Sequence, residues 1–178
     1  MNPRFALKKA TDDVHGELDG LLSKLDLSDP ADYAKFLSIQ ARVLPALECA
    51  LDRFGMAAIV ADWDEHRRAS LLRDDLEALG ERMPEPLEIP AMDSAAKALG
   101  AAYVMEGSRL GGQMLVKSVG PGMPNSFLFP NGHKGAWPAL VAALNDNLGS
   151  APLLDEAKDA AARTFGLFLE AAHISGLE

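Results

Sequence analysis

The sequence predicts an all-α fold of six or more helices, formed by residues 1–178 as a single domain. Apolar residues recur three and four positions apart along most of the chain, which is the spacing that keeps side chains on one face of a helix. Capping residues, prolines and glycines bound these stretches at the places where helices begin and end. The sequence lacks the alternating pattern of a strand, the turn residues of a β-hairpin and any internal repeat.

The first expected helix runs from residue 4 to about residue 26. Its apolar stripe consists of Leu7, Ala10, Val14, Leu18, Leu21 and Leu25. The second helical stretch begins at a capping residue, Ser28 or Asp29, and ends at Gly55. Pro45 should bend this stretch or split it in two, because a proline inside a helix removes a hydrogen bond and clashes with the preceding turn.

Four further helices are expected, within residues 67–80, 93–120, 137–149 and 150–173. The helix within 93–120 should open at Asp93 or Ser94. An extended linker is expected at 83–90, because prolines and the residues before them avoid the helical conformation. The segment 121–135 carries three prolines and is expected to be a loop.

Composition excludes several classes of function. With 17 Lys and Arg against 26 Asp and Glu, the formal net charge is −9. This charge argues against nucleic acid and anionic membrane as main partners, since both attract basic surfaces. Cys49 is the single cysteine, so we expect neither an internal disulfide nor a cysteine-based zinc site, and the cytoplasm is the expected location. The sequence contains neither a signal-peptide pattern nor an apolar run long enough to span a bilayer.

Glycines interrupt one expected helix in an unusual way. The segment YVMEGSRLGGQMLVKSVG, residues 103–120, contains Gly107, Gly111 and Gly112, and Gly100 precedes it by one turn. Each glycine inside a helix costs about 0.8–1 kcal/mol relative to alanine. Positions 100, 103, 107 and 111 lie along one face of the helix. This face predicts either tight packing against another helix or a backbone laid against a flat ligand.

His15 lies at the edge of the apolar stripe of the first helix, where the protein core meets solvent. A lone histidine at such a place is usually structural, but a neutral imidazole is also a common ligand of haem iron. Lys8 lies seven residues earlier, about 10 Å along the helix axis. That is about the span from a haem iron to its propionates. Asp19, one turn later, can reach the imidazole directly or through water.

Three segments resemble the haem oxygenase family. LKKATDDVHGELD, residues 7–19, resembles the helix that carries the iron ligand, with its pattern K-x-A-T-x-x-x-H. YVMEGSRLGGQ, residues 103–113, resembles the helix on the opposite side of the haem, and is most similar to bacterial members, including those that supply bilin to phytochromes. DEAKDAAARTFGLFLEAA, residues 155–172, resembles the last core helix of the family.

The resemblance implies an enzyme that uses haem as both substrate and cofactor and cleaves it with dioxygen to biliverdin, carbon monoxide and ferrous iron. The implied haem-binding residues are Lys8, Thr11, His15, Asp19, Tyr103, Gly107, Ser108, Gly111 and Gly112. His15 would bind the iron, and Lys8 and Tyr103 would meet the propionates. Gly107, Ser108 and Gly111 are the implied catalytic residues on the opposite side. Ser108 stands where many members of the family have an aspartate.

The resemblance also implies an external electron donor, a reductase or a ferredoxin-type protein, and a phytochrome as the receiver of bilin. Arg4, Lys8 and Lys9 form a local basic cluster, so we expect a small acidic redox protein to dock there. One alternative is a haem-binding or interaction protein that has this fold and lacks turnover, for which Ser108 is the position to examine.

Two unrelated classes of protein would depend on single residues of this chain. A phosphotransfer bundle with His15 as acceptor is disfavoured, because Glu17 and Asp19 follow this histidine where a lysine is usual. A thiamin-degrading enzyme of similar fold needs an active-site cysteine, and Cys49 is expected to be buried and inert.

The remaining histidines and two methionines are assigned structural roles. His66 is expected to be solvated within a charged stretch, His133 to lie in a loop, and His173 to lie near the chain end. Met105 and Met114 are expected to fill the core.

Overall fold

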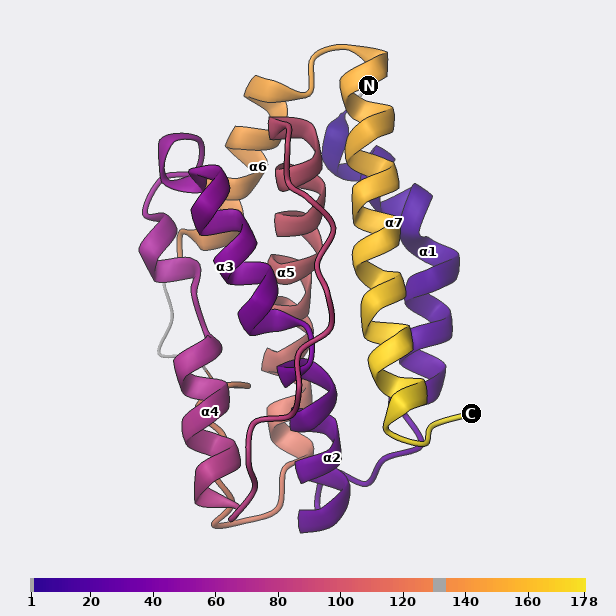
Figure 1. Ribbon diagram of the computed structural model, residues 1–178, viewed down its shortest axis with the longest axis vertical. Coiled ribbons are helices and arrows are strands. Elements are labelled where there is room, and N and C mark those ends of the chain that lie inside the picture. The colour runs from indigo at the N-terminus through magenta and orange to yellow at the C-terminus, as the bar shows by residue number, and fades with distance from the viewer. Residues whose placement is uncertain (1, 130–133) are drawn as a thin grey trace.

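The computed structural model describes residues 2–129 and 134–178, and over these residues the fold is all-α (Figure 1). The described α-helices are α1 (Pro3–Leu22), α2 (Pro30–Ala41), α3 (Leu44–Phe54), α4 (Ala69–Ala78), α5 (Ala95–Leu115), α6 (Ala136–Asn147) and α7 (Ala151–Ile174). Short 3-10 helices, which the sequence did not predict, lie at Met56–Ala58, Trp63–His66 and Val116–Ser118. No strand occurs within the described residues, so the predicted fold class is confirmed.

Local sequence signals explain most helix boundaries in the first half of the chain. The side chain of Asp29 accepts hydrogen bonds from the backbone N–H groups of the first turn of α2. Pro45 splits the expected long helix, and it occupies the first turn of α3, where its missing N–H is not needed. Gly55 ends α3 with a φ of 94°, a left-handed conformation that favours glycine. The first helix, α1, ends at Leu22 rather than near residue 26.

The N-terminus of α4 is capped by a residue from another helix. Arg68, at the capping position, makes no side-chain cap hydrogen bond. Instead, the carboxylate of Glu48 in α3 accepts hydrogen bonds from the backbone N–H groups of Arg68 and Ala69, at 2.6 and 3.2 Å. Burial raises the pKa of Glu48, although these two hydrogen bonds oppose the shift. In contrast, α5 begins as expected, with the Ser94 hydroxyl accepting from the N–H of Lys97.

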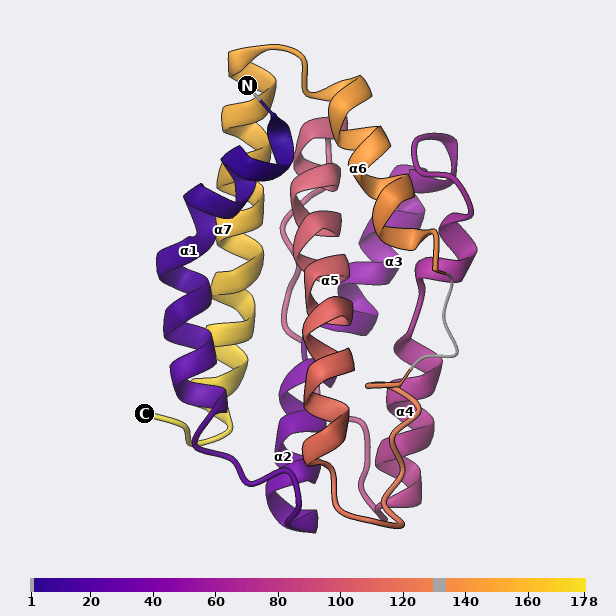
Figure 2. The same cartoon turned by 180° about the vertical axis from the view of Figure 1, so that it is seen from behind.

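Helix α5 runs through the middle of the molecule. On one flank, α7 packs against α5 and α1 packs against α7, and α2, α3 and α4 form the other flank (Figure 1; Figure 2). The predicted extended linker crosses the face shown in Figure 1, from the end of α4 to the start of α5. It is held by hydrogen bonds with Arg42, at the end of α2: Leu87 donates to the Arg42 carbonyl, and the Arg42 side chain donates to the Glu85 carbonyl.

Gly100 allows α5 and α7 to approach each other closely. A Cβ atom at this position would lie 2.2 Å from the carbonyl oxygen of Ala157 in α7, so a side chain larger than hydrogen has no room. For Gly100, the packing explanation of the glycine face is therefore the one that the structure supports.

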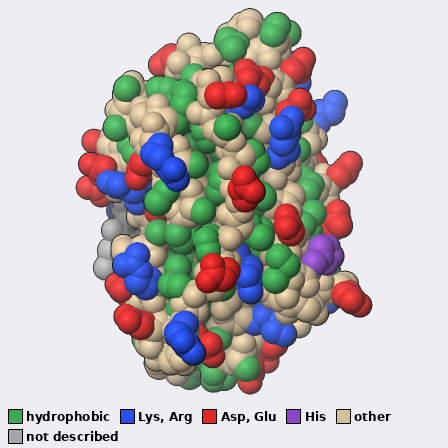
Figure 3. Space-filling view, viewed as in Figure 1, with side chains coloured by type: hydrophobic (Ala, Val, Ile, Leu, Met, Phe, Trp, Pro, Cys, Tyr) green, Lys and Arg blue, Asp and Glu red, His purple; other side chains and the backbone are tan. Residues whose placement is uncertain are grey.

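The distribution of charge on the surface and the hydropathy of the helices agree with what the amino-acid composition predicts. On the face shown in Figure 3, acidic, basic and apolar side chains are interspersed, and no broad basic field covers its described residues. No helix in the described part of the chain is both long enough and apolar enough to cross a membrane.

Two predicted burial states are wrong. Cys49 is exposed, because Leu47, Glu48 and Leu51 occupy the face of α3 that meets the core and Cys49 points away from it. Met114 is 77% exposed near the end of α5, whereas Met105 is fully buried as expected.

Candidate functional site

All nine residues that the sequence analysis assigned to haem binding line one cleft. The cleft lies between α1 and α5, and α2, α7 and residues 127–128 complete its walls. Its empty space is about 850 Å³, including the part that opens to solvent.

On the α1 wall, His15 presents its imidazole to the cleft. The side chain is 54% exposed, and its ring stacks on Phe165 of α7 with the ring centroids 5.0 Å apart. The Nε2 atom lies 3.4 Å from a carboxylate oxygen of Asp19, slightly beyond the range of a good hydrogen bond. The imidazole is therefore oriented by an aromatic neighbour and a carboxylate, and is accessible to a ligand.

Lys8 and Thr11 lie further toward the start of α1. Lys8 donates a hydrogen bond to a carboxylate oxygen of Asp12, one turn later, at 2.9 Å, and both side chains are more than half exposed. The hydroxyl of Thr11 is buried and donates to the carbonyl of Leu7 at 2.9 Å, within its own helix. Lys8 can exchange its partner for a ligand at small cost, since exposed ion pairs contribute about 0–1 kcal/mol.

On the opposite wall, α5 exposes its backbone to the cleft. A Cβ atom at Gly107 or at Gly111 would meet no heavy atom within 4 Å outside its own stretch of helix, so these positions face open space. Ser108 lines the cleft beside them. Gly112 differs, because a Cβ there would lie 3.2 Å from a side-chain carbon of Leu128. The glycines of α5 therefore serve helix packing at position 100, loop packing at 112 and cleft space at 107 and 111.

Tyr103 lines the cleft on α5, one turn before Gly107. Its ring tilts against that of Trp137 in α6, with centroids 5.8 Å apart, and the Arg4 guanidinium lies over the same tryptophan ring. Burial raises the pKa of Tyr103, although the positive charge of Arg4 opposes the shift. The phenol is therefore a neutral hydrogen-bond donor at physiological pH.

The side walls of the cleft come from residues that the sequence did not predict. Phe36 and Gln40 contribute from α2, Phe127 from the loop, and Phe165 and Phe168 from α7. Gln40 is a buried polar residue, and nothing in the pattern of α2 distinguishes it from a structural residue.

The loop wall is fixed by a carboxylate from another helix. The backbone N–H groups of Ser126 and Phe127 donate to the buried carboxylate of Asp75 in α4, at 3.1 and 2.8 Å. The phenylalanines of the segment SFLF were the available signal in the sequence, but their place beside α5 depends on this contact across 51 or 52 residues.

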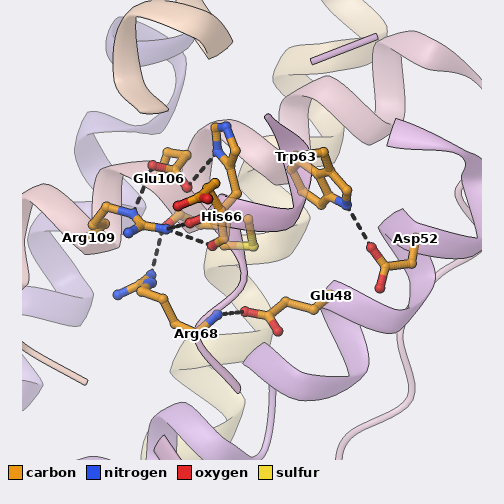
Figure 4. A network of polar contacts seen from close by, with 9 residues as sticks. Glu48, Asp52, Trp63, His66, Arg68, Glu106 and Arg109 are labelled. Atoms are coloured by element: carbon orange, nitrogen blue, oxygen red, sulfur yellow. Dashed lines mark hydrogen bonds and ion pairs between the residues drawn. The ribbon is translucent and has the colours of Figure 1, made fainter. Parts of the chain in front are cut away.

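The prediction that His66 is solvated is wrong. Its side chain is fully buried behind α5, and its Nδ1 atom donates a hydrogen bond to Glu106 at 2.9 Å (Figure 4). Arg109 donates to the second carboxylate oxygen of Glu106 at 3.1 Å and to the His66 carbonyl at 2.7 Å. Buried polar groups need such partners, and Glu106 lies 40 residues away in the sequence, so the charged appearance of the local stretch was misleading.

Neither of the other described histidines, His66 and His173, lines the cleft. His173, near the end of α7, has its Nδ1 atom 2.8 Å from the carbonyl oxygen of Leu177. His133 lies outside the described residues. Within the described ranges, no three His, Cys, Asp or Glu residues gather in a way that could hold a metal ion.

The residues of the cleft fit a haem. Its phenylalanines and leucines form apolar walls suited to a flat macrocycle, and His15 offers a single imidazole ligand from one wall. On the other wall, Gly107 and Gly111 leave space where side chains would otherwise fill the cleft. Lys8 and Tyr103 provide a cation and a hydroxyl for carboxylates.

Comparisons with known proteins agree with this fit. No protein-family model matches the chain. A haem oxygenase of Xanthomonas campestris pv. campestris (strain 8004) is 30% identical over 146 residues, which cover 79% of this chain and 88% of that protein. The solved structure of the NO- and CO-bound haem oxygenase of Neisseria meningitidis has the same fold, with a TM-score of 0.84 and 24% identity, over 100% of this chain and 94% of that one.

Proposed function

This chain belongs to the haem oxygenase family, and from this premise we propose how its cleft binds and orients haem. The protein is an oxidoreductase that cleaves haem to biliverdin, carbon monoxide and ferrous iron, with dioxygen and electrons from a reductase. Haem is both substrate and cofactor. When bound, it supplies the iron that activates dioxygen and the ring that is cut.

The observation that carries the proposal is the pairing of two walls across one cleft. His15 of α1 lies on one wall, and the open backbone of Gly107 and Gly111 in α5 lies on the other. We assign the iron-binding role to His15, which is a neutral donor and, unlike a thiolate, does not favour O–O cleavage. Asp19 orients the imidazole of His15 by accepting a hydrogen bond from the imidazole nitrogen that does not bind iron, directly or through water.

The α5 wall provides space and polar groups near the iron. At Gly107 and Gly111 the backbone can approach the ring face, and no acidic side chain stands there. The Ser108 hydroxyl can donate to an ordered water, the role that an aspartate has in many family members. Gln40 of α2 lines the same cleft, and its side-chain amide can bind a water molecule there. Haem binding without turnover is the alternative, and membership of the family does not favour it.

The propionates are assigned to the end of the cleft near Lys8 and Tyr103. Lys8 would exchange Asp12 for a propionate, and the neutral phenol of Tyr103 would donate a hydrogen bond. Thr11 supports this part of α1 through its hydrogen bond to Leu7 rather than through a free hydroxyl.

We extend the proposal to the setting of the enzyme. Residues 1–178 act as one domain, and a small acidic redox protein, of the ferredoxin type or a reductase, docks near Arg4, Lys8 and Lys9. The similarity of residues 103–113 to bacterial members supports supply of bilin to a phytochrome. A single cysteine that cannot form an internal disulfide supports the cytoplasm as the location.

The decisive experiment adds haemin to the purified protein and follows the Soret band, then supplies a reductant and dioxygen and follows the bilin absorbance. We expect saturable binding of one haem per chain, followed by loss of the Soret band and growth of the biliverdin spectrum. A stable Soret band with no bilin under reducing, aerobic conditions would support the alternative of haem binding without turnover.

A further inference from the structure

A buried polar network lies against α5, close in sequence to the glycines that face the cleft. Glu106 is its centre: one carboxylate oxygen accepts from His66 Nδ1, and the other accepts from Arg109 Nε (Figure 4). Arg109 also donates to the carbonyls of Glu65 and His66, at 3.3 and 2.7 Å. The side chains of Glu106 and Arg109 are no more than 5% exposed. The 3-10 helix Trp63–His66 is thereby fastened to α5.

Arg68 connects this network to the backbone of α5 and to the cleft wall. Its Nη2 atom donates to the carbonyl of Met105 at 2.9 Å, immediately before the segment 106–112. Its guanidinium also lies over the ring of Phe127, 4.9 Å from the centroid, and Phe127 lines the cleft. Burial and the charge of Arg109 lower the pKa of Arg68 to about 10, so this group remains charged at neutral pH.

The segment that this network holds would otherwise be poorly restrained. Residues 107–112 include three glycines, and Gly107 and Gly111 have no neighbour on the cleft side. Charged groups buried in this way are seldom the best route to stability, since apolar replacements of similar shape are often as stable. Their effect here is to fix position, because each of them contacts α5 or belongs to it.

We propose that His66, Arg68, Glu106 and Arg109 form a positioning network that fixes the backbone of residues 107–112 over the haem and thereby selects which meso carbon is cleaved. The inference rests on the proposed function, because it requires haem in the cleft. These are positioning residues, since none of the four lines the cleft, whereas Gly107, Ser108 and Gly111 of α5 do. The distance from these three residues to the haem therefore depends on how far α5 lies from the plane of the haem and on how the helix is rotated about its own axis.

The first test needs no haem. Amide hydrogen exchange is measured on residues 107–112 of the apo-protein for Glu106→Gln, which removes the charge and keeps the shape of the side chain. Exchange should be about tenfold faster or more than in the wild type, because local opening becomes easier when the helix loses its anchor. Asp93→Asn is the matched control: it removes an ion pair with Lys97 at the other end of the same helix, and exchange at 107–112 should be unchanged.

The second test reads the position of α5 in the complex. The C–O stretching frequency of the ferrous CO complex reports the polar environment beside the iron, and the ratio of biliverdin isomers reports the carbon cleaved. Glu106→Gln should shift the frequency and change the isomer ratio, whereas Asp93→Asn should do neither. Turnover should fall about tenfold to a hundredfold, since misplacement by about 1 Å costs up to about 100-fold.

A pair of substitutions at His66 separates positioning from simple packing. His66→Asn places an amide N–H near the position of Nδ1, and His66→Gln places it one bond farther away. Asn should restore the wild-type frequency and isomer ratio more fully than Gln. If Glu106→Gln does not fold, the same measurements are made on Arg68→Lys. This variant keeps the positive charge but is too short to donate to the carbonyl of Met105.

Wild-type frequency and isomer ratio in a folded Glu106→Gln or Arg68→Lys protein would overturn the inference, as would equal behaviour of Asn and Gln at position 66. Failure of the proposed function is distinguishable, because in that case the wild type itself would bind no haem or form no bilin, while the exchange experiment would still report on α5.

Discussion

Gly100 of α5 and Ala157 of α7 are in backbone contact: a Cβ at position 100 would lie 2.2 Å from the Ala157 carbonyl oxygen. Gly111, three turns later on the same helix, has open space where its Cβ would be. One stripe of glycines on one helix therefore contains two kinds of position, and substitution by alanine should separate them.

Gly100→Ala should destabilise the protein by about 1–3 kcal/mol or more, because overpacking forces neighbouring atoms to move and the atom in the way is a rigid backbone oxygen. Denaturant unfolding of the apo-protein measures this change directly. An unfolding free energy equal to that of the wild type would show that α5 and α7 can separate without cost.

Gly111→Ala should have the opposite effect on the apo-protein, with a gain of up to about 1 kcal/mol, because alanine is the better helix former and finds no clash. In the haem complex, the added methyl group should intrude on the ring or its bound gas and lower turnover. Gly20→Ala on α1 is the control, since its Cβ also meets nothing within 4 Å and Gly20 does not line the cleft. Normal turnover in Gly111→Ala would remove this position from the haem face.

His15→Ala should abolish the imidazole-bound spectrum and the formation of biliverdin while the helical circular dichroism is retained, because the side chain is 54% exposed and contributes little to the core. His173→Ala, at the end of α7, removes a histidine outside the cleft and should leave spectrum and turnover intact. Biliverdin formation at the wild-type rate in His15→Ala would assign the iron ligand to another residue.

Charge reversal at Arg4 and Lys9 should slow electron delivery from an acidic redox partner and flatten its dependence on salt, because local potential steers protein encounter. Stopped-flow reduction of the haem complex at several ionic strengths measures both effects. The control reverses two exposed arginines elsewhere, Arg73 and Arg82. Equal reduction kinetics in all three proteins would place the docking surface away from the start of α1.

Stability in acid should depend on Glu106. Burial alone raises the pKa of this carboxyl, but the hydrogen bond from His66 and the charges of Arg109 and Arg68 outweigh it and hold the pKa below its ordinary value of 4.5. Ionised Glu106 therefore stabilises the folded state at neutral pH, and this contribution is lost as the pH falls below 4.5 and through the folded pKa.

Glu106→Gln should accordingly cost about 3–5 kcal/mol at pH 7, since it leaves buried cations without their partner. Unfolding measured at pH 7 and near pH 3 should show a smaller difference between the variant and the wild type in acid. A difference independent of pH would mean that the charge of Glu106 does not contribute to stability.

Boundaries were predictable where one residue decides the local conformation. Asp29 and Ser94 cap helices through their own side chains, Gly55 adopts a left-handed turn, and Pro45 cannot stand inside a helix. The cap of α4 by Glu48 was not predictable, since it joins residues that only the tertiary fold brings together.

The residues of the candidate site divide in the same way, into those that a local sequence pattern marks and those that only tertiary packing brings to the site. His15 could be singled out because an imidazole at the edge of an apolar stripe, together with the surrounding motif, carries information within one helix. His66 was misjudged because its neighbours in the sequence are charged and its partner lies on another helix. Gln40 and Phe127 belong to the cleft through packing alone, so no local pattern marks them.

The contact at Gly100 makes α5 comparable to a lever with its pivot at this residue. Because the two backbones touch there, a tilt of the helix would displace Gly100 least and Leu115 most. Leu115 lies fifteen residues further on, an arm of about 22 Å at 1.5 Å per residue, and a tilt of about 5° would move it by about 2 Å. The positioning network holds this arm at Met105, Glu106 and Arg109, five to nine residues beyond the contact, so a small displacement caused by the loss of one of these hydrogen bonds would be amplified toward Leu115 at the cleft.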